Sequence, residues 1–205
     1  MRCTLRREEE LRREGYARVA GADEAGRGSL FGHVYAAAVI LDADNPVDGL
    51  ADSKTLTAAR RGALAGEIRK RAAGWAVAWA DASEIDDINI YQASRLAIRR
   101  AVEMLDPPAV YLLIDALTVD VDLPQEGIIK GDAKVASIAA ASILAKVARD
   151  EWVEQADAEY PGYGLARHKG YATPEHKEAL ERLGPTPLHR RSYAPVRAAM
   201  QGRLG

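Results

Sequence analysis

The segment Val19-Ala-Gly-Ala-Asp-Glu-Ala-Gly-Arg-Gly28 joins an apolar stretch to two adjacent carboxylates and a glycine-flanked arginine. The apolar part predicts a strand over 16–22, so Asp23 and Glu24 should stand where that strand ends. Paired acids without a neighbouring His or Cys are typical of a hard divalent metal held by oxygen ligands. The two glycines allow a ligand to approach the backbone closely. The segment therefore predicts metal-assisted chemistry on a phosphate ester whose sugar or phosphate is touched by the backbone.

Length and composition indicate one domain over residues 1–205, because 48% hydrophobic content is ordinary for a globular core. The single cysteine, Cys3, excludes an intrachain disulfide and a zinc site built on cysteines. No apolar run approaches the roughly 20 residues that cross a membrane. The Arg- and Glu-rich stretch 1–14 is not a secretory signal and predicts a short solvated helix. We expect a cytoplasmic, monomeric protein.

The net charge of −2 is unevenly distributed along the chain. Residues 161–205 hold eight Lys and Arg against three acids, so this segment carries +5 and the rest carries −7. A basic segment beside an acidic one suits an anionic polymer bound next to an acid-held metal. A solvated surface could have the same composition, so charge alone does not decide. The segment from about residue 160 to 205 is nevertheless a candidate substrate-binding portion of the domain.

The predicted elements start with neighbouring strands and then alternate strands with helices, which is typical of an α/β domain with a mixed sheet. The stretch 33–41 is almost continuously apolar, so its strand should be buried on both faces. Thr57 is a candidate N-cap for one helix and Ser83 for the next. All three tryptophans are expected in the core. The other predictions are strands over 75–80, 109–114 and 127–130, and helices over 57–72, 89–105, 133–159 and 174–183.

Two more acids are placed like Asp23 and Glu24. Asp115 follows the fourth predicted strand, and Asp132 precedes the long helix. Acids at strand ends and helix starts can converge at one edge of a sheet, where four carboxylates would suit one or two Mg²⁺ or Mn²⁺ ions. A turn explains Asp115 equally well, and N-capping is the default role for Asp132. Other acids also remain open: Asp42, Asp44, Asp48, Asp86, Asp87, Asp120 and Asp122.

Several common motifs are absent from the sequence. Phe31 stands where a dinucleotide-binding fingerprint requires glycine, and Lys54-Thr55 lacks the preceding glycines of a Walker A loop. There is no Gly-X-Ser-X-Gly nucleophile elbow. These absences leave the carboxylates as the leading candidates for chemistry.

A series of short motifs, in order along the chain, resembles the type 2 ribonucleases H, specifically the bacterial ribonuclease HII family. The resemblance covers roughly residues 15–197, and the combination is highly specific. The motifs are Gly21-Ala-Asp-Glu-Ala-Gly-Arg-Gly28, Asp52-Ser53-Lys54, Asn89-Ile90, Tyr111-Leu-Leu-Ile-Asp115, Lys130-Gly131-Asp132, Ile138-Ala-Ala-Ala-Ser-Ile-Leu-Ala-Lys-Val-Ala-Arg-Asp150, Tyr160-Pro-Gly-Tyr-Gly164, His168-Lys-Gly-Tyr-Ala-Thr173 and His189-Arg-Arg-Ser-Tyr-Ala-Pro195.

The resemblance implies an RNase H-like fold, with a mixed five-stranded sheet flanked by helices and a helical C-terminal part. It implies hydrolysis of the RNA strand of RNA–DNA hybrids and incision 5′ to single ribonucleotides in duplex DNA, leaving 3′-hydroxyl and 5′-phosphate ends. Such an activity would remove misincorporated ribonucleotides and RNA primers. The implied cofactor is Mn²⁺ or Mg²⁺, with two ions when substrate is bound.

The resemblance also assigns roles to particular residues. It implies that Gly26-Arg27-Gly28 contacts the 2′-hydroxyl beside the scissile phosphate and that Tyr171 packs on the adjacent sugar. The chain departs from the family's usual proline at Ser29 and His33, which border the turn. The implied metal ligands and catalytic residues are Asp23, Glu24, Asp115 and Asp132, and the further substrate-binding candidates are Ser53, Lys54, His168, Lys169 and Arg191.

Two rival interpretations remain open. Another nuclease of the RNase H fold, such as a junction resolvase, would share the acids without needing the Gly-Arg-Gly turn. A catalytically silent hybrid-binding protein would not need all four acids, and their presence here argues against it.

Overall fold

A mixed five-stranded sheet forms the centre of the computed structural model, which describes residues 3–202. The strand order is β3-β2-β1-β4-β5. Strand β1 pairs antiparallel with β2 and parallel with β4, which brings the carboxyl ends of β1 and β4 to the same edge. The sheet predicted from the sequence is confirmed. The strands are β1 (Val19–Ala25), β2 (Val34–Ile40), β3 (Gly74–Ala80), β4 (Tyr111–Asp115) and β5 (Gln125–Ile128).

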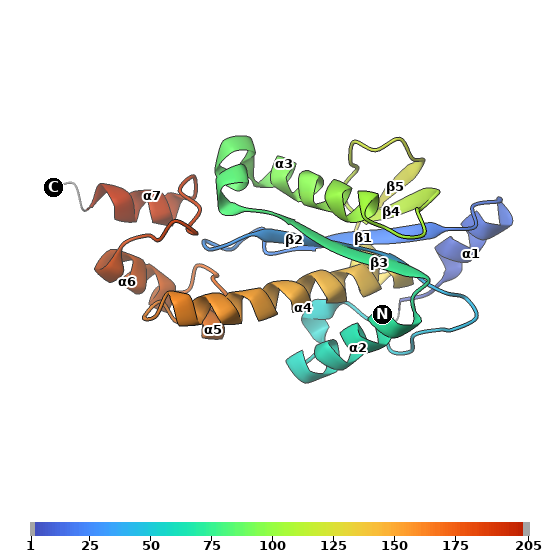
Figure 1. The fold of residues 1–205 in the computed structure, drawn as a ribbon, viewed down its shortest axis with the longest axis horizontal. Helices are drawn as coiled ribbons and strands as arrows, with labels where there is room; N and C mark the ends of the chain where they lie inside the picture. The colour runs from blue at the N-terminus through green and yellow to red at the C-terminus, as the bar shows by residue number, and fades with distance from the viewer. Residues whose placement is uncertain (1–2, 203–205) are drawn as a thin grey trace.

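Helices cover both faces of the sheet (Figure 1). Helix α3 lies on one face, and α2 and α4 lie on the other. The C-terminal helices gather beyond the end toward which β1 runs, which gives the expected helical C-terminal part. The helices are α1 (Arg6–Arg13), α2 (Ala58–Arg71), α3 (Ala82–Glu103), α4 (Ala136–Glu159), α5 (Leu165–His168), α6 (Pro174–Leu183) and α7 (Ala194–Gln201), with short 3₁₀ turns η1 (Ser53–Thr55) and η2 (Gly131–Ala133).

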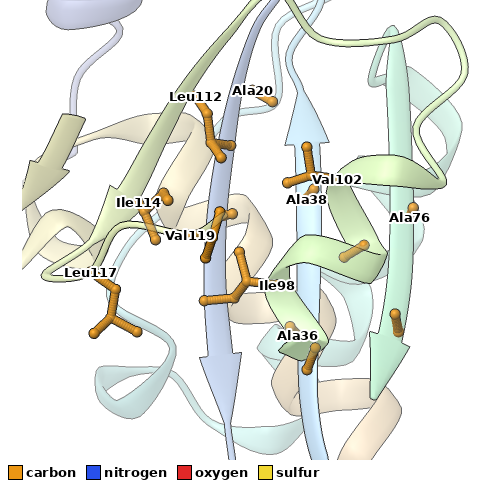
Figure 2. Close-up of a cluster of buried hydrophobic side chains, with 14 of the residues drawn as sticks. Ala20, Ala36, Ala38, Ala76, Ile98, Val102, Leu112, Ile114, Leu117 and Val119 are labelled. Atoms are coloured by element: carbon orange, nitrogen blue, oxygen red, sulfur yellow. The ribbon is translucent and has the colours of Figure 1, made fainter. Parts of the chain in front are cut away.

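Small side chains let these layers pack closely. Every residue of β2 is buried, as its unbroken apolar run predicts. Ala36 and Ala38 face α3, whereas Ala37 and Val39 face α2 and α4. Figure 2 shows the α3 side of this core, where Ile98 and Val102 lie over the alanines of the central strands. The alanine-rich composition therefore gives thin, closely spaced layers instead of a core built on large aromatic rings.

Strand β1 and helix α4 approach each other so closely that glycine is required. A Cβ at Gly21 would lie 2.2 Å from the Ser137 carbonyl carbon, far inside van der Waals contact. The close approach fixes the start of α4 and the preceding η2 turn against the strand that carries Asp23 and Glu24.

Some local predictions are wrong in instructive ways. Strand β1 continues to Ala25, because its pairing with β2 extends to Tyr35, so Asp23 and Glu24 lie within the strand and not after it. The N-cap of α3 is Asp81, which forms a capping box with Glu84, and Ser83 lies inside the helix. Thr57 caps α2 as expected.

Helix α1 is not simply solvated. Glu8 is fully buried, and its carboxylate accepts a hydrogen bond of 2.8 Å from the Ser137 N–H in the first turn of α4. A carboxylate there satisfies a free N–H and complements the helix dipole. Helix α1 thereby fixes the start of α4.

Two of the three tryptophans are placed differently from the prediction. Trp75 and Trp79 are 39% and 49% exposed, because alternate residues of the edge strand β3 face away from α3. Trp152 is partly buried and packs against Phe31 and His33. Within residues 3–202, no helix is long and apolar enough to cross a membrane.

Candidate active site

Three acids predicted from the sequence meet at one edge of the sheet. Strand register pairs Ala22 with Ile114, so the next residues, Asp23 and Asp115, lie side by side. The η2 turn adds Asp132, because the Gly131 N–H donates to Asp115 Oδ1 over 2.7 Å. One carboxylate oxygen from each of Asp23, Asp115 and Asp132 lies within 4.8 Å of the others. The arrangement could hold a divalent cation with oxygen ligands.

The cluster keeps its negative charges close together in a poorly solvated place. Burial raises the pKa of Asp23 well above its usual value, and repulsion from Glu24 and Asp115 adds to the rise. Burial also raises the pKa of Asp115, against the hydrogen bond from Gly131. Removing these charges from water is costly unless a cation compensates them. The donor set therefore fits a bound divalent metal.

Glu24 lies beside this group but outside the set of three. Its Oε1 forms an ion pair of 3.2 Å with Arg27, and its buried Oε2 has no hydrogen-bond partner among the described residues. Burial raises the pKa of Glu24, and Arg27 opposes that rise. An unpartnered buried oxygen is a position that a cation could satisfy.

Asp132 does not have the ordinary N-cap role. The N-cap residue of α4 is Val135, with no side-chain cap bond, and Glu8 supplies the carboxylate instead. Asp132 Oδ2 forms an ion pair of 3.2 Å with Lys54. Ser53 is buried and shares a hydrogen bond of 2.9 Å with Ser142. The Lys54 side chain therefore reaches Asp132 from the surface, since it stays 77% exposed.

A cavity of about 230 Å³ lies next to the acids. The Gly-Arg-Gly turn forms one wall and Tyr171, which is 37% exposed, forms another. The turn and the Tyr171 segment are joined by a bridge between Ser29 and Tyr171 and by the Leu30 N–H donating to the Gly170 carbonyl over 2.9 Å. The cavity is lined by Glu24, Ala25, Gly26, Arg27, Gly28, Ser53, Lys54, Ser142, Lys146 and Tyr171.

Arg190 fixes the Gly-Arg-Gly turn from the interior of the protein, a role that the sequence did not predict. It is fully buried and donates to the carbonyl groups of Arg27, Gly32 and His33 at 2.9, 2.9 and 3.1 Å. The Tyr193 hydroxyl also donates to the Arg27 carbonyl. The His-Arg-Arg-Ser-Tyr motif contained both residues, but nothing in it distinguishes the buried arginine from its exposed neighbour.

Three predicted substrate contacts lie outside this cavity. The His168 ring donates to the Tyr163 carbonyl over 2.8 Å, and Lys169 pairs with Glu154 at 2.5 Å. The backbone N–H of Arg191 donates to Asp86, and its side chain lines a separate cavity near α3.

Buried imidazoles support the Tyr171 segment. The Thr186 N–H donates to His189 Nδ1 over 2.9 Å, so the His189 Nε2 proton points to His176 Nε2, 3.0 Å away. His176 Nδ1 then donates to the Tyr171 carbonyl over 3.0 Å. Because each ring both donates and accepts a hydrogen bond, this chain of hydrogen bonds requires both histidines to be neutral.

Acid should destabilise the fold through its buried histidines. Burial lowers the pKa of His189 to about 3 and of His33 to about 4, from 6.5. Below pH 6.5 the unfolded chain binds protons that these two folded rings do not, so the histidine contribution to stability falls as pH falls. The raised pKa values of Asp23, Glu24 and Asp115 act in the opposite direction. Moving from pH 7 to 5.5 should cost about 1 kcal/mol for each of these two histidines.

The variant His33→Phe separates the two contributions. His33 lies among the rings of Trp152, Tyr35 and Trp79, so Phe should fit there. Urea unfolding should show that the loss of stability between pH 7 and pH 5.5 is about 1 kcal/mol smaller in His33→Phe than in the wild type. An unchanged pH dependence in His33→Phe would contradict the proposed contribution of that ring.

The family model described as Ribonuclease HII matches residues 20–196. The chain belongs to the ribonuclease HII family. It is 57% identical over 197 residues to the ribonuclease HII of Solibacter usitatus (strain Ellin6076), covering 96% of this chain and 86% of that protein. The resemblance drawn from the sequence motifs is confirmed, and with it the assignment to the ribonuclease H endonucleases.

Solved structures show the same fold. Ribonuclease H2 from Pyrococcus horikoshii OT3 superposes with a TM-score of 0.78 at 25% identity, covering 92% of this chain and all of that chain. Bst-RNase HIII, solved in complex with Mn²⁺, gives a TM-score of 0.71 at 21% identity, covering 92% of this chain and 71% of that chain. The predicted RNase H-like fold is confirmed.

Proposed function

We propose that this chain hydrolyses the RNA strand of RNA–DNA hybrids and incises duplex DNA 5′ to single ribonucleotides, leaving 3′-hydroxyl and 5′-phosphate ends. One observation carries the proposal: the Asp23–Asp115–Asp132 cluster lies beside a cavity walled by the Gly-Arg-Gly turn and Tyr171. A site for phosphodiester chemistry thus adjoins a site that could receive a ribose.

The four acids Asp23, Glu24, Asp115 and Asp132 would hold Mn²⁺ or Mg²⁺, with two ions when substrate is present. The fit rests on clustered carboxylate oxygens and on the unpartnered Glu24 Oε2. When bound, the metal would supply a water of lowered pKa and positive charge for the leaving 3′-oxygen. Lys54 and Arg27 each neutralise one acid and also line the cavity, where they could meet phosphates.

The Gly-Arg-Gly turn would detect the 2′-hydroxyl. That hydroxyl both donates and accepts hydrogen bonds, which is how a protein distinguishes RNA from DNA. Arg190 and Tyr193 both donate hydrogen bonds to the Arg27 carbonyl. These bonds would keep the turn rigid while its other backbone groups form hydrogen bonds with the sugar. Tyr171 would pack on the next sugar from the opposite wall.

Metal addition should stabilise the folded chain. The bound cation would compensate the repulsion among Asp23, Asp115 and Asp132, whereas the unfolded chain lacks this site. Mn²⁺ at 100 times its dissociation constant should add about 2.7 kcal/mol, measured as a higher unfolding midpoint. Sodium chloride at matched ionic strength is the control, and an equal rise with sodium would contradict a specific site.

The remaining roles extend from the same proposal. The basic portion from about 160 to 205 would contact the nucleic acid beyond the cavity, with His168, Lys169 and Arg191 near phosphates. Lys169 would have to exchange its Glu154 partner for a phosphate. A monomeric, cytoplasmic enzyme of this kind would serve ribonucleotide and primer removal.

A cleavage assay with Mn²⁺ tests the activity. The substrates are an RNA–DNA hybrid, a DNA duplex with one ribonucleotide, and a four-way DNA junction of similar length. We expect cutting of the first two, with products that carry 5′-phosphates and extendable 3′-ends. Preferential cutting of the junction would indicate a resolvase, and binding without cutting would indicate a silent hybrid-binding protein.

A further inference from the structure

Arg149 of α4 lies fully buried behind the candidate active site. In the sequence, Arg149 stands within the motif that runs from Ile138 to Asp150, and nothing there gives it a role of its own. Lys146 forms the close ion pair with Asp150, at 2.6 Å, whereas Arg149 Nη1 lies 3.7 Å from the same carboxylate. Arg149 is therefore not explained by that pair.

Its charge is poorly compensated. Nη2 donates to the Lys169 carbonyl over 2.8 Å, but Nε and Nη1 have no hydrogen-bond partner among residues 3–202. A buried cation with unmade hydrogen bonds reduces the stability of the fold. A methionine of similar length would fill the space without that cost. The buried charge of Arg149 is therefore better explained by a role in positioning the residues around it than by a contribution to the stability of the fold.

The guanidinium contacts both walls of the cavity. A Cβ at Gly26 would lie 2.1 Å from Arg149 Nε, so the backbone of the turn rests directly on the side chain. On the other side, Arg149 Cζ lies 5.2 Å from the centre of the Tyr171 ring, within cation–π range. The bond to Lys169 also fixes the backbone two residues before Tyr171, where Lys169 has a φ of 51°.

We propose that Arg149 is a positioning residue, which sets the Tyr171 ring against the Gly-Arg-Gly turn so that a ribose fits between them. Because Arg149 is buried and does not line the cavity, it acts through these two walls and not by touching substrate. The inference deepens the proposed function and rests on the substrate role of Tyr171.

The test compares Arg149→Met with Arg149→Lys on a duplex that contains one ribonucleotide. Arg149→Met keeps the length of the side chain but loses the cation and the bond to Lys169. Its kcat should fall roughly 10- to 100-fold through misplacement of the walls, while KM changes by less than about threefold. Arg149→Lys keeps a cation near the ring and should retain more of kcat.

Thermal unfolding separates positioning from a structural role. Because Arg149→Met removes a poorly compensated buried charge, its melting temperature should equal or exceed that of the wild type. Arg13→Met, on the exposed face of α1, is the matched control and should match the wild type in kcat. A wild-type kcat in Arg149→Met, or a loss of kcat that only follows a loss of folded protein, would overturn the proposal.

Tyr171→Ala, measured alongside, distinguishes two failures. If Tyr171→Ala loses activity and Arg149→Met does not, the Arg149 inference fails and the proposed function stands. If Tyr171→Ala cleaves like the wild type, Tyr171 has no substrate role and the inference fails with it.

Discussion

The variant Asp115→Asn is expected to lower kcat on a duplex with one ribonucleotide by about 10³-fold, since a metal supplies several kcal/mol of charge stabilisation. The Asn side-chain oxygen can still accept the hydrogen bond from the Gly131 N–H, so the η2 turn should keep its place. Asn also removes one of the mutually repelling charges. The metal-free variant should therefore melt at the same temperature as the wild type or higher.

The exposed Asp122, on the loop between β4 and β5, gives the matched control. Asp122→Asn should leave kcat and the melting temperature unchanged, and it should keep the stabilisation by Mn²⁺ that Asp115→Asn loses. If the activity of Asp115→Asn stayed within about tenfold of the wild type, Asp115 would not be a metal ligand. A tenfold loss corresponds to only about 1.4 kcal/mol of activation free energy, which is less than a metal ion supplies.

The second large effect concerns the two glycines of the turn, which should respond differently to alanine. Gly26 has a φ of 98°, and a Cβ there would collide with Arg149. Gly26→Ala should lose about 2–4 kcal/mol of stability through strain and overpacking. At Gly28 the nearest atom to an added Cβ is Tyr171 Cε1 at 3.9 Å, so the fold has room for a methyl group.

Gly28→Ala should therefore change stability by less than about 0.5 kcal/mol. The methyl group would nevertheless enter the cavity opposite Tyr171, so kcat/KM should fall by roughly 10²-fold. Urea unfolding and initial rates measure the two quantities. If Gly28→Ala cleaves at the wild-type rate, the ribose does not bind between the turn and Tyr171.

Residue patterns predict the fold where burial follows local chemistry. The continuous apolar run of β2, the Thr57 cap and the Pro174 start of α6 are all visible in the sequence and confirmed. The extension of β1 through Asp23 and Glu24 was missed, because pairing with β2 overrides the local preference of charged residues. The exposure of Trp75 and Trp79 depends on β3 being an edge strand, which is a property of the whole sheet.

The residues of the candidate site also differ in how far the sequence could predict them. The sequence predicted the three clustered aspartates after strands or before a helix, and this was enough to nominate them although Asp23 lies inside β1. Selecting them from the other acids required the family resemblance. The supporting residues Glu8, Arg149 and Arg190 could not be found, because their roles depend on contacts made more than a hundred residues away along the chain or on burial.

The most direct test of the central claim uses two DNA duplexes that differ by one 2′-hydroxyl. Both are incubated with the wild-type chain and Mn²⁺, and the products are mapped at single-nucleotide resolution. We expect one cut, on the 5′ side of the ribonucleotide, and an intact all-DNA duplex. Equal cutting of both duplexes would contradict the claim that the Gly-Arg-Gly turn and Tyr171 select a ribose beside the acid cluster.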